Sequence, residues 1–243
     1  MIDRRDDGRV TVLTLNRPDR RNAVDSEVCE AIAAAVWSAY DDGAGARAIV
    51  LAGEGPHFCA GADLKTGEPI EFAGHLRAAL DALREVPCVT IAAVQGAALG
   101  AGMQLAVACD LRVAAADARF GIPAAKLGLM VDLWTIQRVA ALCGHGPARA
   151  VLLACEEIAA EDALSIGLAS RAGDLAAAIG WAERIAELAP LTIAGHKLGL
   201  NRLDPSLDDP RFRVAFERAW ASDDLREGRS AFAEKRLPRF EGR

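Results

Sequence analysis

The sequence has few aromatic residues, no excess of basic residues and no cysteine pairing pattern. Only 5% of its 243 residues are aromatic, and 28 basic against 34 acidic side chains give a net charge of −6. A nucleic-acid-binding protein needs a concentrated basic surface, so we exclude that class. The six cysteines form no CxxC pair and have no zinc-ligand spacing with the four histidines. This argues against a metal site and against a small secreted fold held by disulfides.

Long hydrophobic segments of the kind that cross membranes are also missing. The chain opens on polar residues, which predicts no signal peptide. Residues 86–109 carry no charge between Val86 and Cys109, but they include Pro87, Gln95 and Gln104. This composition favours a buried strand, a turn and a buried helix over a membrane span. We therefore expect a cytoplasmic protein in a reducing compartment.

What is present is a regular alternation of strand and helix patterns. Of the residues 52% are hydrophobic, including 51 alanines, which is enough for a sizeable core. Apolar runs predict strands at 10–15, 48–52, 89–94 and 111–115. Helical spacing predicts a helix after Asp25, a plausible N-cap, another ending before Pro87, and mostly helices from Trp134 onward. The pattern indicates an α/β domain with a helical C-terminal part.

Two glycine-bearing turns follow buried strands and are the first candidates for chemistry. They span residues 57–64 and 96–102. The second is not a dinucleotide fingerprint, because Leu105 stands where the third glycine belongs. Glycine lets a backbone approach a ligand closely, and free turn amides can stabilise developing negative charge. Ordinary turn chemistry is the alternative for each segment taken alone.

Positive charge gathers in two places within this acidic chain. Arg17, Arg20 and Arg21 cluster with only Asp19 opposing them. Residues 226–243 hold six cations against three acids. A solvated helix face explains the second cluster as well as a phosphate site does.

Four ordered motifs resemble the crotonase (enoyl-CoA hydratase/isomerase) family over nearly the whole chain. They are the segments 15–23, 58–64, 94–110 and 227–236. The resemblance implies an α/β, crotonase-like spiral of ββα units with a C-terminal helical trimerisation part. It implies a spiral core that binds acyl-CoA over 1–190, and a helical region for oligomerisation and coenzyme A contacts over 191–243. A homotrimer or a dimer of trimers is expected.

The resemblance also assigns roles to residues. The backbone amides that polarise the thioester carbonyl fall at Ala62 and Ala101, and Leu133 and Trp134 fall in the acyl pocket. No covalently bound cofactor is implied; a coenzyme A thioester is the ligand or substrate. The coenzyme A contacts, the last two from the same or a neighbouring subunit, are Arg20, Arg21, Ala23, Ala60, Asp63, Leu64, Phe232 and Lys235.

The sequence departs from the family at the two glutamates that hydration uses. Gln104 stands at the first position and Ala124 at the second, after Pro123. Glutamine keeps the hydrogen bonds of glutamate but exchanges no proton at neutral pH, and alanine keeps nothing. Each positioned acid or base contributes about 10²–10⁴-fold to a rate. Weak or absent hydratase activity is therefore expected.

One carboxylate, Asp132, is a candidate replacement. It falls in the loop that lines the acyl pocket in the family, where an aspartate acts as base or nucleophile in some members. The alternative is a helix N-cap, since Asp132 precedes the predicted helix from Trp134. Trp134 either walls the acyl channel or packs in the core. We predict that His57 is a turn histidine, and that Cys59, like Cys109, is a small buried hydrophobe.

Three functions remain open at this stage. The first is an acyl-CoA-binding protein of lipid metabolism with little or no turnover. The second is an active enzyme, either a hydratase (a lyase) or an isomerase or thioester enzyme that uses Asp132. The third is a subunit that assembles with a partner fatty-acid enzyme.

Overall fold

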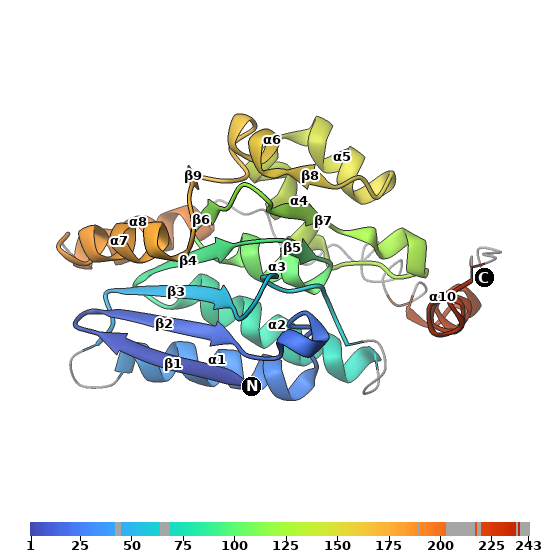
Figure 1. Ribbon diagram of the computed structural model, residues 1–243, viewed down its shortest axis with the longest axis horizontal. Helices are drawn as coiled ribbons and strands as arrows, with labels where there is room; N and C mark the ends of the chain where they lie inside the picture. Colours follow the sequence, from blue (N-terminus) through green and yellow to red (C-terminus); the bar gives the residue numbers. More distant parts are fainter. Residues whose placement is uncertain are drawn as a thin grey trace.

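A six-stranded sheet lies at the centre of the computed structural model (Figure 1). The structure describes residues 1–41, 45–63, 69–188, 190–202, 217, 220–236 and 238. In spatial order the strands are β1 (Ile2–Asp7), β2 (Val10–Leu15), β3 (Ala48–Gly53), β4 (Val89–Val94), β6 (Leu111–Ala114) and β9 (Arg171–Ala172). β1 pairs antiparallel with β2, and the later neighbours are parallel.

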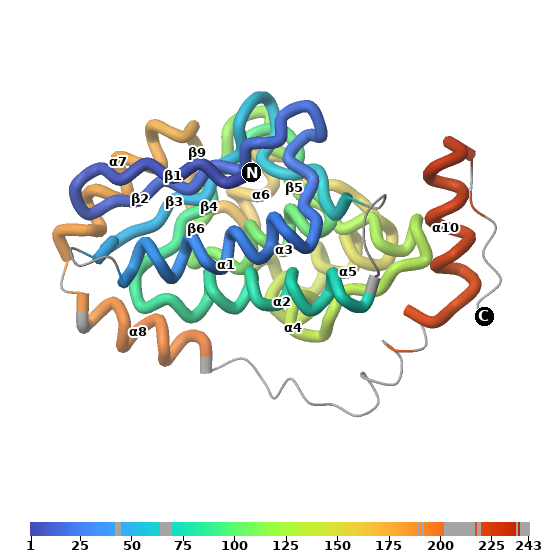
Figure 2. The backbone as a smooth tube through the Cα atoms, turned by 90° about the horizontal axis from the view of Figure 1, so that it is seen from below, coloured from blue at the N-terminus to red at the C-terminus, as the bar shows by residue number. Residues whose placement is uncertain are grey.

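Helices cover both faces of this sheet, which is why the inner strand β3 is apolar and buried throughout. In β3, Ile49 and Leu51 belong to the core on one face, and Ala48 and Val50 to the core on the other. The first face is covered by α1 (Ser26–Asp41), α2 (Pro69–Glu85) and α3 (Ala101–Ala108), and the second by α7 (Leu175–Ala186). Figure 2 shows α1 and α2 running side by side.

A smaller sheet and further helices complete the chain. The sheet joins β5 (Ala97–Leu99), β7 (Arg119–Gly121) and β8 (Ile158–Ala159). The 3₁₀ helices are η1 (Pro18–Arg20) and η2 (Pro123–Leu127), and the remaining α-helices are α4 (Leu133–Cys143), α5 (His145–Leu153), α6 (Ala160–Ser165), α8 (Pro190–Arg202) and α10 (Asp223–Glu234). Figures 1 and 2 place α8 and α10 at opposite ends of the molecule. None of the helices in the described ranges has the length and hydropathy of a membrane span.

The predicted elements are confirmed where the hydrophobic pattern was strong. β2, β4 and α2 occupy the predicted stretches, and Asp25 caps α1 by accepting a hydrogen bond from the Val28 amide at 3.0 Å. Five strands of the described ranges were not predicted, namely β1, β5, β7, β8 and β9. β1 is polar because it is an exposed edge strand, and β5 lies inside the glycine-bearing segment that was expected to be a turn.

Candidate functional site

Two segments that are far apart in sequence, 58–63 and 96–102, are held against each other. Cys59 and Ala98 form an isolated parallel bridge. Its two backbone hydrogen bonds, one donated by each segment, measure 2.9 and 3.0 Å. The two glycine-bearing turns of the sequence analysis therefore meet in space.

Glycine is required for this close approach. A Cβ atom on Gly102 would lie 2.1 Å from the Cys59 carbonyl oxygen, inside any possible contact distance. A Cβ atom on Gly61 would lie 3.2 Å from the carbonyl oxygen of Leu99, and its φ of 119° also favours glycine. The contact between the turns thus depends on the absence of side chains at Gly102 and Gly61.

Two backbone amides at this contact have no acceptor within the part of the chain that the structure describes. The Val24 amide donates to the Gly61 carbonyl at 2.9 Å, and the Asp63 amide to the Val24 carbonyl at 2.7 Å. Val24 and Ala62 form a second isolated parallel bridge. In this bridge Ala62, which lies between Gly61 and Asp63, directs its own N–H away from Val24. Ala101 opens α3, where an N–H has no partner within the helix. Among the described residues we find no acceptor for either amide.

The N-terminus of α3, which is the positive end of the helix dipole, lies at this point, and the helix is buried. All eight of its residues are buried. At its other end the Arg112 guanidinium donates to the carbonyls of Ala106 and Cys109, at 3.3 and 2.9 Å. Burial lowers the pKa of Arg112 to about 10. A cation at the C-terminus complements the helix dipole, whose positive end lies at Ala101. Arg112 was not predicted as a functional residue, since one arginine in an otherwise apolar strand gives no distinctive sequence pattern.

A cavity of about 930 Å³ opens beside the two amides. Ala62 and Ala101 line it, together with residues of α2, α4, η2 and α10. Most of its lining is apolar, which suits an acyl group. The charged and polar lining residues are Asp63, Arg77, Asp81, Arg84, Gln104, Asp132 and Arg229.

Both positions at which the resemblance predicts glutamate face this cavity. Gln104 lies on α3 and Ala124 in η2, and both are lining residues. Gln104 is buried, with 8% of its surface exposed. Its Oε1 accepts a hydrogen bond from the Thr135 hydroxyl at 3.0 Å. Thr135 was not singled out from the sequence, because a threonine in the first turn of a helix is unremarkable there.

Asp132 is the N-cap of α4, so the capping alternative is confirmed. Its Oδ1 accepts a hydrogen bond from the Thr135 amide at 2.7 Å. Its Oδ2 lies 3.4 Å from Nη1 of Arg77. The same carboxylate also lines the cavity. Capping and a place in the cavity wall therefore coexist in one residue.

Trp134 is both a core residue and part of the cavity wall. It is 1% exposed and, like Leu133, lines the cavity. The guanidinium carbons of Arg77 and Arg84 lie 5.2 and 5.6 Å from its ring centre. The two alternatives predicted for Trp134 are therefore compatible.

An ion-pair cluster on α2 accompanies this tryptophan. Asp81 lies 2.6 Å from Arg77 and 3.2 Å from Arg84. Burial opposes the charged guanidinium of Arg77, but hydrogen bonds and charges from Asp81 and Asp132 outweigh it and raise the pKa of Arg77. This cluster was not predicted from the sequence, although the i, i+4 spacing of Arg77 and Asp81 is a signal for an ion pair on a helix.

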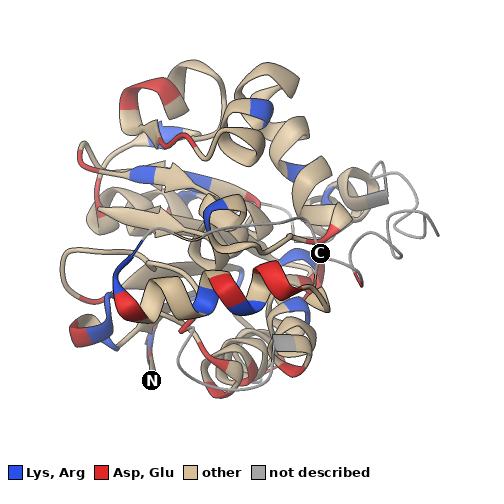
Figure 3. Cartoon of the chain, turned by 90° about the vertical axis from the view of Figure 1, so that its right-hand side faces the viewer, with Lys and Arg blue, Asp and Glu red and all other residues tan. Residues whose placement is uncertain are grey.

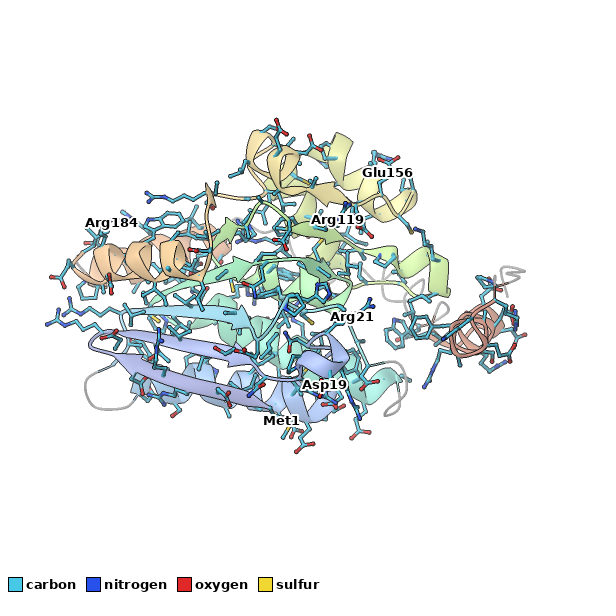
Figure 4. The ribbon with its side chains drawn as sticks, viewed as in Figure 1. Met1, Asp19, Arg21, Arg119, Glu156 and Arg184 are labelled. Carbon is cyan, nitrogen blue, oxygen red and sulfur yellow. The ribbon has the colours of Figure 1, made fainter. Side chains whose placement is uncertain are left out.

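The cations predicted to meet coenzyme A lie on the turn after β2, next to the Ala62 segment. Arg20 is 2.7 Å from Asp63. Arg21 is exposed, and its carbonyl accepts the Ala60 amide at 2.9 Å. Figure 4 labels Arg21 and its neighbour Asp19 on this turn. The structure thus brings this group of predicted residues together, as it does Ala23, whose carbonyl accepts a hydrogen bond from Arg17. Leu64 lies outside the described residues.

α10 closes one side of the cavity of its own chain. Gly228 packs so tightly on η2 that a Cβ atom there would lie 2.0 Å from the Leu127 carbonyl oxygen. The indole of Trp220 donates to the Met130 carbonyl at 3.1 Å. Phe232 lines the cavity and is 54% exposed. Lys235 ends the helix, exposed and outside the cavity lining. Figure 3 shows the mixed charges of α10.

Comparison with known proteins decides the family. Residues 5–243 match the model of the enoyl-CoA hydratase/isomerase family. The chain belongs to this family. A relative named "Probable enoyl-CoA hydratase echA6" from Mycobacterium bovis is 45% identical over 237 residues, covering 96% of each chain.

Solved structures of the enoyl-CoA hydratase/isomerase family share the fold. An enoyl-CoA hydratase from Mycobacterium avium subsp. paratuberculosis superposes with a TM-score of 0.87 at 29% identity, covering 99% of this chain and 98% of the other. A methylmalonyl-CoA decarboxylase, 23% identical, reaches 0.91 and supports the fold alone, covering 100% of this chain and 98% of the other. The predicted α/β crotonase fold, with two sheets and C-terminal helices, is confirmed.

The remaining candidates are structural. Nδ1 of His57 accepts the Ala97 amide at 3.2 Å, which fixes the histidine at the turn. Burial raises the pKa of Cys59 and of Cys109 to about 12, as expected for apolar packing. Over the ranges the structure describes, no three histidine, cysteine or acidic side chains gather as a metal site.

Proposed function

We propose that the chain binds an acyl-CoA thioester of lipid metabolism and hydrates it slowly or not at all. The carbonyl oxygen accepts hydrogen bonds from the Ala62 and Ala101 amides. The observation that carries the proposal is the presence of these two amides, both without an acceptor among the described residues, at the wall of one largely apolar cavity. Two preorganised donors favour a carbonyl oxygen that gains negative charge.

The described residues that line the cavity support slow hydration. Gln104 and Ala124 occupy the positions where the resemblance predicts glutamates. The carboxylates among the described lining residues are Asp63, Asp81 and Asp132, and each is ion-paired with arginine. Each of these carboxylates therefore already has an arginine partner, with which a water molecule would have to compete. Slow hydration is the expected consequence.

The coenzyme A moiety is proposed to follow the predicted contacts. Arg20 and Arg21 flank its phosphates and pantetheine near Ala23 and Ala60, while Asp63 and Leu64 border the adenine. Phe232 and Lys235 complete the site from α10, of the same or a neighbouring subunit. We further propose a homotrimer or a dimer of trimers, assembled through the helical region 191–243.

A second candidate function is an enzyme that uses Asp132. The relatives' names favour turnover, since they are called hydratases. Asp132 lies in the cavity wall, accepts a hydrogen bond from the Thr135 amide, and is linked through Thr135 to Gln104. This placement favours Asp132 as the reacting group. An isomerase or thioester enzyme needs only one such carboxylate.

Two assays separate these functions. Calorimetric titration with butyryl-CoA and palmitoyl-CoA is expected to show saturable binding, and no heat with either would overturn the binding proposal. Hydration of crotonyl-CoA is expected to be slow for the wild type and faster for the Gln104→Glu/Ala124→Glu double variant, by about 10²-fold or more. Wild-type turnover equal to that of an ordinary hydratase would contradict the proposal.

A further inference from the structure

We propose that Thr135 fixes Gln104 as a hydrogen-bond donor that selects a 3-oxoacyl thioester, with a ketone on the third carbon of the acyl group. The proposal rests on the proposed thioester site. Thr135 is a positioning residue in it, and Gln104 is the residue that contacts the ligand. The proposal goes beyond the substitution of glutamate by glutamine, because it concerns what the amide group recognises.

The hydrogen bond between the two side chains sets the orientation of the Gln104 amide. The Thr135 hydroxyl donates to Oε1 of Gln104 at 3.0 Å. Thr135 is fully buried, and its own amide donates to Asp132 at 2.7 Å. Asp132 is in turn paired with Arg77. This chain of contacts commits the oxygen end of the Gln104 amide to the protein, so the NH₂ end is the one left for a ligand.

The NH₂ group has access to the cavity. Among the described residues we find no acceptor for Nε2 of Gln104. The described side-chain nitrogen and oxygen atoms that are fully buried and lack a hydrogen-bond partner are His75 Nδ1, Arg84 Nε and Gln137 Oε1. Nε2 of Gln104 is not one of them, so it is not fully buried. It therefore contacts open space, and the open space that Gln104 borders is the cavity. An unpaired donor there is costly until a ligand oxygen satisfies it.

Helix geometry places this donor along the acyl group. Ala101 and Gln104 are three residues apart on α3, so they share a face and are separated by a rise of about 4.5 Å. Side chains on a helix lean toward its N-terminus, which brings the Gln104 amide back toward the Ala101 amide. With the thioester oxygen on Ala101, the Gln104 donor lies beside the carbons that follow the carbonyl.

The chemistry of the donor favours a ketone over other groups at that carbon. An alkyl chain or a carbon–carbon double bond leaves the NH₂ unpaired. A hydroxyl also brings a proton that needs an acceptor, in a cavity whose lining is mostly apolar. A ketone oxygen only accepts, so it matches a group that only donates. A carboxylate at that carbon would bind more weakly, because the Asp132 carboxylate would repel it.

Competition between thioesters of equal length tests the proposal. Dissociation constants are measured by calorimetry for acetoacetyl-CoA and butyryl-CoA, and again for 3-oxododecanoyl-CoA and dodecanoyl-CoA. In the wild type, the 3-oxoacyl thioester is expected to bind about 3- to 10-fold more tightly than the saturated thioester of the same length, for whichever length binds. This is the effect of one neutral hydrogen bond. Gln104→Met and Thr135→Val are expected to reduce this ratio to about one, and Thr135→Ser to restore it.

A matched control separates recognition from a general loss of structure. Gln137→Met makes the same replacement on α4 outside the cavity lining, and it is expected to keep the wild-type ratio. An equal affinity for both members of each pair in the wild type overturns this inference but leaves the thioester site standing. An unchanged ratio in a folded Gln104→Met variant overturns it as well. Failure of all four thioesters to bind overturns the thioester site and this inference together.

Discussion

Asp132 combines a structural role, the cap of α4, with a place in the cavity wall. It caps α4 through the Thr135 amide, pairs with Arg77 and borders the cavity. The sequence predicted the cap from residue type and position alone. It gave no sign of Arg77, because the ion pair joins residues 55 positions apart.

Replacing Asp132 separates the two roles. Asp132→Ala removes the cap and is expected to lower the free energy of unfolding by about 0.5–2 kcal/mol, measured by denaturant titration. Asp132→Asn keeps a capping oxygen but removes the charge, so it is expected to cost less stability than alanine. If Asp132 is the reacting group, the asparagine variant loses whatever turnover the wild type has. Turnover that persists in Asp132→Asn assigns this residue to structure alone.

The buried cysteines give a pH dependence at the same scale. Burial raises the pKa of Cys59 and Cys109 from 9.0 to about 12. The unfolded chain therefore releases these thiol protons at lower pH than the folded chain does. Their contribution to stability is complete below pH 9 and is lost as the pH rises toward 12.

Thiol reactivity measures the burial that raises these pKa values. The folded protein is expected to react with a thiol reagent at pH 8 far more slowly than the protein unfolded in guanidinium, because all six cysteines are buried. A rapid reaction of Cys59 or Cys109 in the folded protein, identified by mass spectrometry, would contradict apolar burial of that thiol.

At the scale of elements, the site depends on how closely α3 approaches the Cys59 segment. Gly102→Ala places a Cβ atom against the Cys59 carbonyl. We expect it to lower the free energy of unfolding by about 1–3 kcal/mol and to weaken thioester binding, because the two amides are moved apart. Gly146→Ala in α5 is the matched control, since nothing lies within 4 Å of its Cβ position. Equal thioester affinities in the two variants would contradict the requirement for this contact.

The sequence predicts the elements of this fold better than their meeting points. Apolar runs located β2, β3 and β4 because these strands are covered on both faces. β1 escaped because an edge strand needs no apolar pattern. The resemblance placed Ala62 and Ala101 in one site, and the structure brings their segments together. Arg112 and the Thr135 hydroxyl could not be foreseen, since they bond to groups on other elements and leave no local pattern. For Arg77 the i, i+4 spacing to Asp81 was the one local signal.

At the scale of the whole molecule, α10 joins the end of the chain to the cavity. Gly228→Ala would press a Cβ atom on the Leu127 carbonyl and lift α10 from η2. We expect weaker acyl-CoA binding. Overpacking costs about 1–3 kcal/mol, and if this cost applies to the form in which α10 closes the cavity, the dissociation constant rises by about 10-fold or more. The core should unfold at nearly the wild-type temperature, because α10 packs outside the central sheet.

A control in α8 completes that comparison. Gly199→Ala adds the same atom to an exposed helix at the other end of the molecule, where nothing lies within 4 Å. It is expected to bind acyl-CoA like the wild type. Equal affinities for the Gly228 and Gly199 variants would show that α10 does not close the binding site.

Infrared difference spectroscopy measures most directly whether the two amides donate hydrogen bonds to the thioester carbonyl. The ligand is a bound acyl-CoA with a ¹³C label at its carbonyl carbon. Two donors at Ala62 and Ala101 polarise the carbonyl more strongly than water does, so its stretching band is expected to fall below the frequency seen for the same thioester in buffer. A band at or above the frequency in buffer, with the site saturated, would contradict the placement of the thioester oxygen between these amides.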